Sequence, residues 1–369
     1  MLNFILWEVS PELFPDGWLP IRWYGLLFAT GFLLGQQILI RIYKGEGKSE
    51  KHVETLTVYM VIATVIGARL GHCLFYEPDH YLRNPIDILK IWEGGLASHG
   101  AALGILIAIW LYSRREVGQS YFYVLDRLVI VIALAGALIR TGNLMNHEII
   151  GRETDVPWAF IFTEEPKNTI LAVAQEGRPN SRWTASAIDL DFRHRDTTSH
   201  HHDILLAGLE MDIQFNRQVS DEELPQLLNQ DLRRVFYDYT SVREHLVFPL
   251  TEVQYTARET EHGTLVTLNI FGIPRHPAQL YEALSSFILF LALLWMYSRK
   301  KGKTPEGRLL GLFIIVIFSL RFLYEFFKEA QVPFEEDMMF NMGQILSIPL
   351  VIIGLFIFLR SFRKKNEIN

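Results

Sequence analysis

Residues 123–143 read YVLDRLVIVIALAGALIRTGN. From Leu128 to Ile139 the stretch contains no charged side chain, and an apolar helix of about 20 residues is long enough to cross the hydrocarbon core of a bilayer. The apolar run then changes abruptly into Arg140, Thr141, Gly142 and Asn143. The stretch therefore predicts a membrane-spanning helix that ends in a group of polar side chains.

Six more segments of the chain have the same apolar character. A soluble chain of 369 residues usually has a mean hydropathy below zero, whereas this chain has a value of +0.16. We therefore expect an all-α polytopic membrane protein with seven transmembrane helices. The third segment is the shortest and begins with polar residues, so its end is expected to line a cavity. The seven segments are Ile21–Ile42, Val53–Phe75, Leu96–Tyr112, Tyr123–Asn143, Pro277–Met296, Leu309–Phe327 and Met342–Leu359.

The basic residues predict the orientation of these helices. Lys and Arg gather after the first, third and fifth segments and in the C-terminal tail, for example at Lys44, Arg114, Lys301 and Lys364, whereas the opposite loops contain few. Cytoplasmic loops of membrane proteins carry this excess of positive charge. With seven spans the N-terminus is then periplasmic and the C-terminus cytoplasmic, in a bacterial inner membrane.

A polar insertion separates the fourth and fifth segments. Residues 187–192 and 264–270 alternate apolar and polar side chains with a period of two, which predicts strands. The acidic start at Asp221 predicts a short helix. We expect a periplasmic α+β head over residues 152–273, between transmembrane parts 1–151 and 274–369.

The N-terminal residues and the cysteine give weaker indications. Residues 1–20 contain no Lys or Arg and several carboxylates, so they do not resemble a cleaved signal peptide. We interpret them as an interfacial lead-in with Trp7, Trp18 and Trp23 at headgroup depth. The single cysteine, Cys73, lies in an apolar stretch and is expected to be a buried, inert thiol.

Polar side chains gather at one end of the predicted spans. Ionisable residues within spans usually face the protein interior and are functional. Because these groups all fall at the predicted periplasmic ends, they favour an enzyme acting on outer-leaflet headgroups over a transporter, whose polar groups would reach the midplane and both faces. The four main groups are residues 22–25 (RWYG), 92–100 (WEGGLASHG), 140–151 (RTGNLMNHEIIG) and 275–282 (RHPAQLYE).

The side chains in these groups suit a phosphodiester substrate. Arg140 and Arg275 have the fork geometry that binds phosphate. Asn143, Asn146 and Gln279 can donate hydrogen bonds to phosphate or glycerol oxygens. His99 can transfer a proton near neutral pH, and Tyr24 can do so or anchor a headgroup.

The same four groups resemble the motifs of the prolipoprotein diacylglyceryl transferase family. The stretch from Arg140 through Asn143, Asn146 and Glu148 to Gly151 is similar to the family signature, although Ile139 stands where the family usually has Gly. The His99-Gly100 pair resembles a family motif whose next Gly is Ala101 here. Residues 275–282 match a block in which the family has Ser at position 278, and residues 23–25, 321–325 and 342–349 match further blocks in order. The insertion over 165–270 departs from the family's shorter head.

The resemblance implies a reaction and a site. A diacylglyceryl group passes from phosphatidylglycerol to the lipobox cysteine of a preprolipoprotein, a thioether forms and glycerol 1-phosphate leaves. It implies no metal, no organic cofactor and no nucleic-acid partner; the partners are the two substrates and membrane lipids. The implied catalytic residues are Tyr24, His99, Arg140 and Arg275, and the implied substrate-binding residues are Arg140, Asn143, Asn146, Glu148, Gly151, Gln279 and Tyr281.

Several alternatives remain open at this point. His99 is either the base that deprotonates the thiol or only a headgroup ligand, with Arg275 and a water lowering the thiol pKa. Arg140 can anchor a helix end, Tyr24 can be an interfacial aromatic, and Glu148 can be the partner of an arginine. We expect His147 to be exposed. The run His200–Asp203 is expected to be a solvated loop, because three adjacent histidines cannot all point at one metal ion.

Three other function classes compete with the transferase. A transporter predicts midplane polar groups and repeat symmetry between halves, and neither is visible. An intramembrane hydrolase needs a nucleophile facing its base, but Ser98 and His99 are adjacent and do not face each other on a helix. The third is a structural assembly module, in which the polar insertion would be the working part.

Overall fold

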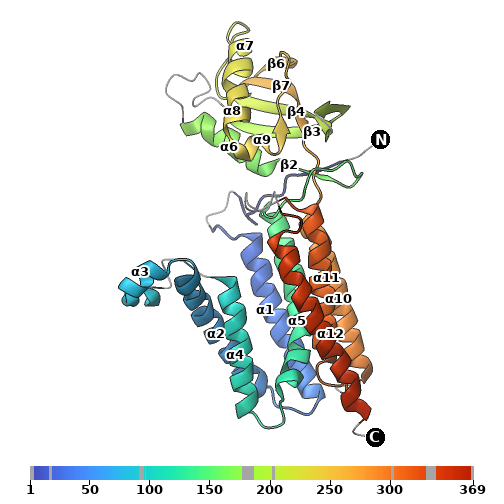
Figure 1. The fold of residues 1–369 in the computed structure, drawn as a ribbon. Coiled ribbons are helices and arrows are strands. Elements are labelled where there is room, and N and C mark those ends of the chain that lie inside the picture. Colours follow the sequence, from blue (N-terminus) through green and yellow to red (C-terminus); the bar gives the residue numbers. More distant parts are fainter. Residues whose placement is uncertain are drawn as a thin grey trace. The chain divides into compact units, whose positions relative to one another are not determined.

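The computed structural model describes two compact units of the chain (Figure 1). It describes residues 4–15, 19–90, 95, 97–176, 187–201, 204–300, 303–329 and 338–366. The first unit comprises residues 1–26, 140–281 and 324–337, and the second comprises residues 27–139, 282–323 and 338–369. Trp18, the stretch from Trp92 to Gly94, Leu96, His202 and Asp203 lie outside the described residues.

The second unit is built from long apolar helices. Six helices among the described residues are long and apolar enough to cross a membrane. A seventh, α4, spans the third predicted segment but is shorter and ends in Arg114 and Arg115, so it does not reach the same length and hydropathy. The helices are α1 (Trp23–Gly45), α2 (Lys51–Phe75), α3 (Pro78–Arg83), the 3₁₀ turn η1 (Pro85–Leu89), α4 (Ser98–Arg115), α5 (Tyr121–Met145), α10 (Ala278–Lys300), α11 (Arg308–Tyr324) and α12 (Met342–Asn366).

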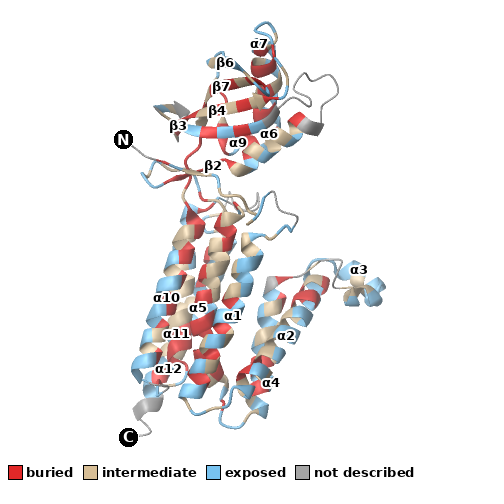
Figure 2. Cartoon of the chain, turned by 180° about the vertical axis from the view of Figure 1, so that it is seen from behind, coloured by how far each residue is buried: buried red, intermediate tan, exposed pale blue. Residues whose placement is uncertain are grey.

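Helix α5 is central to this unit. Of its apolar window 61% is buried, against 17–39% for the other five candidate spans, and Figure 2 shows α5 with mostly buried residues. Leu128, Val129 and Ile130 are almost completely buried, and they pack with Tyr43 of α1 and Leu293 of α10. A helix that is apolar on all sides is expected to be surrounded by other helices or lipid.

Two adjacent charged residues of α5 link it to its neighbours. The Asp126 carboxylate accepts hydrogen bonds from the backbone N–H groups of Gly307 and Leu310, both at 2.8 Å, and so caps the start of α11. The Arg127 guanidinium donates to the Glu46 carboxylate at 2.9 Å, and the two side chains are 3% and 9% exposed. The Tyr297 hydroxyl donates to the same carboxylate at 2.7 Å. Asp126 therefore links α5 to α11, and Glu46, which directly follows α1, links α1 to both Arg127 of α5 and Tyr297 of α10.

Helices α2 and α4 approach each other through small residues. A side chain added at Gly71 would lie 2.7 Å from the Cα of Gly100, and one added at Gly104 would lie 2.6 Å from the Ala63 carbonyl oxygen. Gly67 and Gly71 on α2, and Gly100 and Gly104 on α4, each stand four residues apart. This is the small-xxx-small spacing that lets membrane helices pack backbone to backbone.

The first unit contains the sheet-rich head. Strands β3 (Ala187–His201), β4 (Ile204–Phe215), β7 (Gly263–Gly272) and β5 (Leu246–Val247) pair antiparallel in that order, and β6 (Tyr255–Thr260) pairs with β7. Leu209, Met211, Ile213 and Phe215 are fully buried while the residues between them are partly exposed. This period-two pattern is that of a sheet with one face on a core, so the predicted strands at 187–192 and 264–270 are confirmed.

Short helices cover the buried face of this sheet (Figure 1). Leu227, Leu232 and Phe236 from these helices join the sheet residues in one core. The helix predicted from Asp221 exists but begins at Leu224, because residues 221–223 form the turn before it. The elements are α6 (Glu164–Glu176), α7 (Leu224–Gln226), the π-helical turn η3 (Leu227–Leu232), α8 (Arg233–Asp238) and α9 (Thr240–Arg243).

The structure adds to one sequence-based expectation about this unit and contradicts another. Trp7 lies in β1 (Ile5–Trp7), which pairs parallel with β2 (Phe160–Phe162), and its ring stacks on Phe160 at 5.0 Å, while its expected position at headgroup depth stays a prediction. His200 and His201 do not lie in a loop, because they end strand β3 opposite Leu205 and Ile204 of β4. For Trp7 the pairing is with a segment distant in sequence, whereas the two histidines pair with the strand that follows directly.

Candidate active site

The polar end of α5 forms a connected chain of hydrogen bonds. The Asn143 amide donates to one oxygen of the Glu148 carboxylate at 2.7 Å, and the Asn146 amide donates to the other at 3.1 Å. Arg140 donates to the side-chain oxygen of Asn143 at 3.5 Å. Because Glu148 fixes the amide of Asn143, the oxygen of that amide is turned toward Arg140. Glu148 thus holds two amides and, through one of them, a guanidinium.

The turn that carries Glu148 is held in an unusual backbone conformation. His147 and Ile149 have φ angles of 57° and 59°, which lie in the left-handed region that residues other than glycine rarely adopt. The turn is fixed from the N-terminal segment, because the Trp7 indole donates to the Leu144 carbonyl at 3.2 Å and the His147 Nε2 lies 2.8 Å from the Val9 carbonyl oxygen. Strain of this kind persists where surrounding contacts over-determine it, and it gathers at functional sites.

The expectation that His147 is exposed is wrong. The side chain is only 6% exposed and lies edge-on to Phe162 at 5.7 Å. Burial lowers the pKa of His147, so the ring is neutral near pH 7. Since Nε2 faces a carbonyl oxygen it carries the ring proton and donates it, and Nδ1 is left as an acceptor.

Tyr24 and Gln279 border the same turn. The ring of Tyr24 packs so closely on Gly142 that a side chain there would lie 2.9 Å from the Tyr24 Cδ2. Gln279, at the start of α10, is 1% exposed and donates to the Glu148 carbonyl at 2.5 Å. The third and fourth polar groups of the sequence, and Tyr24 from the first, therefore meet around the residues at the end of α5.

Arg275 is buried and connects several chain segments of the first unit through hydrogen bonds. It is 3% exposed, and its guanidinium donates to the Glu244 carbonyl at 2.6 Å, to the Gly151 carbonyl at 3.3 Å and to the Glu329 carboxylate. Glu153 lies 3.7 Å away. The Arg275 backbone pairs with Phe160 of β2 through two hydrogen bonds. The guanidinium therefore has carboxylate and carbonyl partners within the protein, and its predicted role as a phosphate ligand stays a prediction.

Gly151 lies where three chain segments cross. Its carbonyl accepts from Arg275, and it forms a β-bridge with Lys328. A side chain at this position would lie 2.7 Å from the Cβ of His276 and 2.9 Å from the Phe327 carbonyl oxygen. Only glycine fits this crossing, which gives a physical reason for the last residue of the motif.

An aromatic cluster forms around Tyr281. Its hydroxyl accepts from the Trp158 indole at 2.8 Å and lies 3.2 Å from the His276 Nδ1. The rings of His276 and Phe327 are edge-on at 5.0 Å. Burial lowers the pKa of His276. Trp158 is 53% exposed, so the cluster has an amphipathic surface of the kind found at membrane interfaces.

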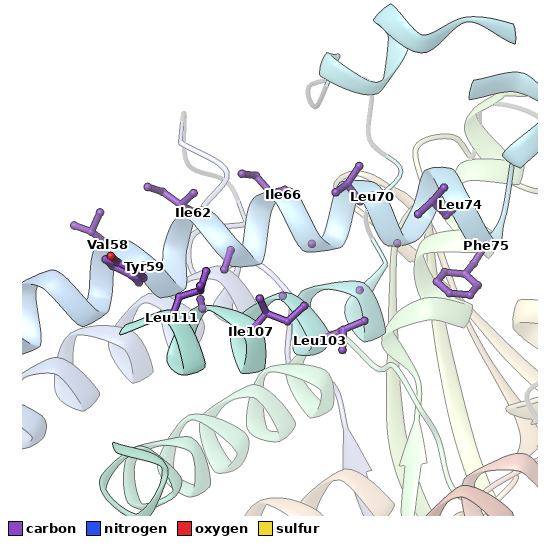
Figure 3. A pocket seen from close by; sticks show the side chains of 16 residues that line it. Val58, Tyr59, Ile62, Ile66, Leu70, Leu74, Phe75, Leu103, Ile107 and Leu111 are labelled. Atoms are coloured by element: carbon purple, nitrogen blue, oxygen red, sulfur yellow. The ribbon is translucent and has the colours of Figure 1, made fainter. Parts of the chain in front are cut away.

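His99 lies in the other unit, in the first turn of α4. It is exposed and contacts the rings of Phe75 at 5.3 Å and Tyr76 at 5.8 Å. Phe75 also borders an apolar groove of about 580 Å³ along α2 and α4 (Figure 3). The groove is lined by side chains such as Ile62, Leu70 and Leu103, with the packed glycines among the lining residues.

Arg69 is buried beside this part of the chain and is structural. It is 3% exposed and donates to the Asp87 carbonyl at 2.6 Å and the Ile88 carbonyl at 2.9 Å. Its guanidinium also lies over the Tyr81 ring at 5.0 Å. These contacts fasten the η1 turn to α2. Cys73 is buried, as expected from its apolar surroundings.

The arrangement defines what the site can do. Nine of the ten predicted site residues lie in the first unit, and only His99 does not. Around the turn that carries Glu148 lie Tyr24, Arg140, Asn143, Asn146 and Gln279. On the chain segments beside this turn lie Gly151, Arg275 and Tyr281. Within the described residues no cluster of His, Cys, Asp or Glu has the form of a metal site. A guanidinium with adjacent amides at a helix end can bind a phosphate and stabilise charge on it.

These features define a polytopic membrane protein with a hydrogen-bonded polar cluster at the end of a candidate spanning helix. The chain belongs to the prolipoprotein diacylglyceryl transferase family, whose model matches residues 11–360. It is 34% identical to the phosphatidylglycerol–prolipoprotein diacylglyceryl transferase of Tolumonas auensis over 98% of this chain and 99% of that protein. Proteins of the same name from Chloroherpeton thalassium and Porphyromonas gingivalis are 34% and 33% identical, each over 98% of this chain and 96% and 95% of their own length.

Proposed function

We propose that this chain transfers the sn-1,2-diacylglyceryl group of phosphatidylglycerol to the lipobox cysteine of a preprolipoprotein, the first step of lipoprotein maturation. Family membership along nearly the whole chain supports this activity. The observation that carries it is the linked set of Arg140, Asn143, Asn146 and Glu148 at the end of α5, which places a guanidinium where it could bind a phosphate.

In this reaction the cysteine sulfur bonds to the glyceryl carbon and the carbon–oxygen bond to the phosphate breaks. Glycerol 1-phosphate leaves with the electron pair, and the thiol proton passes to a base. Negative charge therefore builds on the phosphate in the transition state. A guanidinium already oriented through Asn143 and Glu148 stabilises that charge without reorganisation.

We also propose seven spans, with α4 as the seventh. Its packing along α2 through Gly100 and Gly104 is that of a membrane helix pair, and Arg114 and Arg115 close it as a cytoplasmic end would. The charge asymmetry then supports a periplasmic N-terminus, a cytoplasmic tail, an inner-membrane location and an active site toward the periplasmic leaflet. The three-part division at residues 151 and 273 stays a prediction.

The groove on α2 and α4 suits the acyl chains of a lipid. Its lining is almost entirely apolar (Figure 3). Phe75 at its border contacts His99. Apolar lining without polar partners fits a hydrocarbon chain and not a headgroup.

Loss of the protein is expected to stop lipoprotein maturation in cells. Depletion should leave unmodified prolipoproteins that retain their signal peptides, visible as larger species on immunoblots of a lipoprotein. A structural assembly role predicts instead that the lipoproteins carry their lipid normally after depletion, and that result would contradict the proposal.

His99 is expected to act as the base for the thiol. The variant His99→Gln should lose transfer activity at pH 7 and regain part of it as the pH rises, because solvent then supplies the thiolate. The measurement is the rate of transfer to a lipobox peptide between pH 6 and 9. A variant that stays inactive at every pH argues for a headgroup contact in place of a base.

A further inference from the structure

A polar pocket lies beside the Glu148 turn, and the reaction above makes no use of it. It has a volume of about 380 Å³ and is bordered by the turn at Asn146 and His147 and by α6. From α6 it receives Glu164, Glu165 and Asn168. All of these residues belong to the first unit, and α6 is outside the candidate membrane spans.

The turn presents two buried acceptors that lack a donor within the described residues. They are the side-chain oxygen of Asn146 and the Nδ1 of His147. His147 is only 6% exposed, and its Nε2 already donates to the Val9 carbonyl oxygen. Buried polar atoms without partners are rare and destabilise the folded protein. A ligand that donates hydrogen bonds would remove this destabilisation.

The charge of the pocket selects between the two substrates. Glu164 and Glu165 place two carboxylates on its α6 side. Burial, followed by the charge of Glu244, raises the pKa of Glu165, so a cation beside it would favour its charged form. A phosphodiester headgroup would be repelled by these groups. The polypeptide substrate can supply the cationic, hydrogen-bond-donating group that they favour.

We infer that this pocket binds a lysine or arginine side chain of the polypeptide substrate, close in sequence to the lipobox cysteine. The inference rests on the proposed function, because it takes the polypeptide as a substrate. Asn146 connects the pocket to the site. Its amide nitrogen donates to the Glu148 carboxylate at 3.1 Å, and its side-chain oxygen accepts no hydrogen bond among the described residues. A cation bound to that oxygen orients the amide that holds Glu148.

The test is peptide binding to the full chain in phosphatidylglycerol nanodiscs, followed by fluorescence anisotropy. The probes are labelled lipobox peptides with one lysine at each of the first four positions after the cysteine, and the same peptides with acetyl-lysine. We expect one lysine position to bind about tenfold more tightly than its acetyl-lysine form, a difference of about 1.4 kcal/mol. The double variant Glu164→Gln/Glu165→Gln should abolish that difference.

Glu222→Gln is the matched control, because it removes an exposed carboxylate of the head that does not line the pocket. It should keep the preference for lysine. Equal binding of lysine and acetyl-lysine peptides at all positions, or an undiminished preference in the double variant, overturns the inference. The proposed function is scored separately, because the acetyl-lysine peptides should still accept the diacylglyceryl group. Only a failure of transfer to every peptide counts against the function.

Discussion

Replacing Arg140 with alanine is expected to lower the rate of diacylglyceryl transfer by about 10²–10³-fold, the usual cost of removing one preorganised group that stabilises transition-state charge. Arg140 lies one turn from the end of α5 and is tied to Asn143, which is itself fixed by Glu148. The fall should appear in the rate at saturating lipid as well as at low lipid, because the charge on the phosphate grows during the reaction.

Two controls separate this effect from loss of charge or of folding. Arg140→Lys keeps the positive charge but loses the planar fork, so we expect it to recover only part of the activity. Arg258→Ala removes an exposed arginine from β6 of the head and should leave transfer unchanged. Measurement of glycerol phosphate release by all three variants in nanodiscs decides the matter. Full activity of Arg140→Ala would exclude Arg140 from the site.

Replacing Arg275 with alanine is expected to lower the free energy of unfolding of the head by about 1–3 kcal/mol, because it leaves the carbonyl groups of Glu244 and Gly151 without their buried donor. The guanidinium is 3% exposed and links Glu244, Gly151 and Glu329. The measurement is a urea titration of the full chain in detergent, with pulse proteolysis reporting the survival of the folded head. The midpoint should move to markedly lower urea.

Arg193→Ala is the matched control for this variant. The Arg193 side chain is 54% exposed and donates to Asp212 at 2.7 Å on the surface of the sheet. An exposed ion pair contributes about 0–1 kcal/mol, so the urea midpoint should hardly move. If Arg275→Ala unfolds at the urea concentration of the unchanged chain yet loses transfer, its role is catalytic and the structural interpretation fails.

Local pattern was enough to predict much of the fold. The apolar stretch before Arg140 predicted α5, and six of the seven expected spans are long apolar helices among the described residues. The alternation at 187–192 and 264–270 predicted β3 and β7. In each case a single periodicity within one segment decides the structure, and that periodicity is visible in the sequence.

The rest depends on contacts between distant segments. Nothing in the sequence around Trp7 indicates that it pairs with residue 162 and donates to Leu144. His147 is buried because Val9 and Phe162 close over it, and the pairing of Arg127 with Glu46 joins residues 81 positions apart. For Arg127, the charge within an otherwise apolar span was the available signal, since such a charge needs a partner inside the protein.

The same distinction applies to the candidate site. Residues from 140 to 151 are close in sequence, so one motif predicted the amide, carboxylate and guanidinium that the structure joins. Arg275 contacts the Glu244 backbone carbonyl and the Glu329 carboxylate. These contacts were not predictable from the sequence, because neither residue lies in the motif that contains Arg275. The sequence alone therefore indicates only a phosphate-binding role for the Arg275 guanidinium.

The most direct measurement combines the purified chain in nanodiscs with phosphatidylglycerol and a lipobox peptide. Mass spectrometry should find the peptide heavier by one diacylglyceryl group on its cysteine, with one glycerol 1-phosphate released for each peptide modified. A peptide that stays unmodified with the folded chain, or glycerol phosphate that appears without the cysteine, would contradict the account.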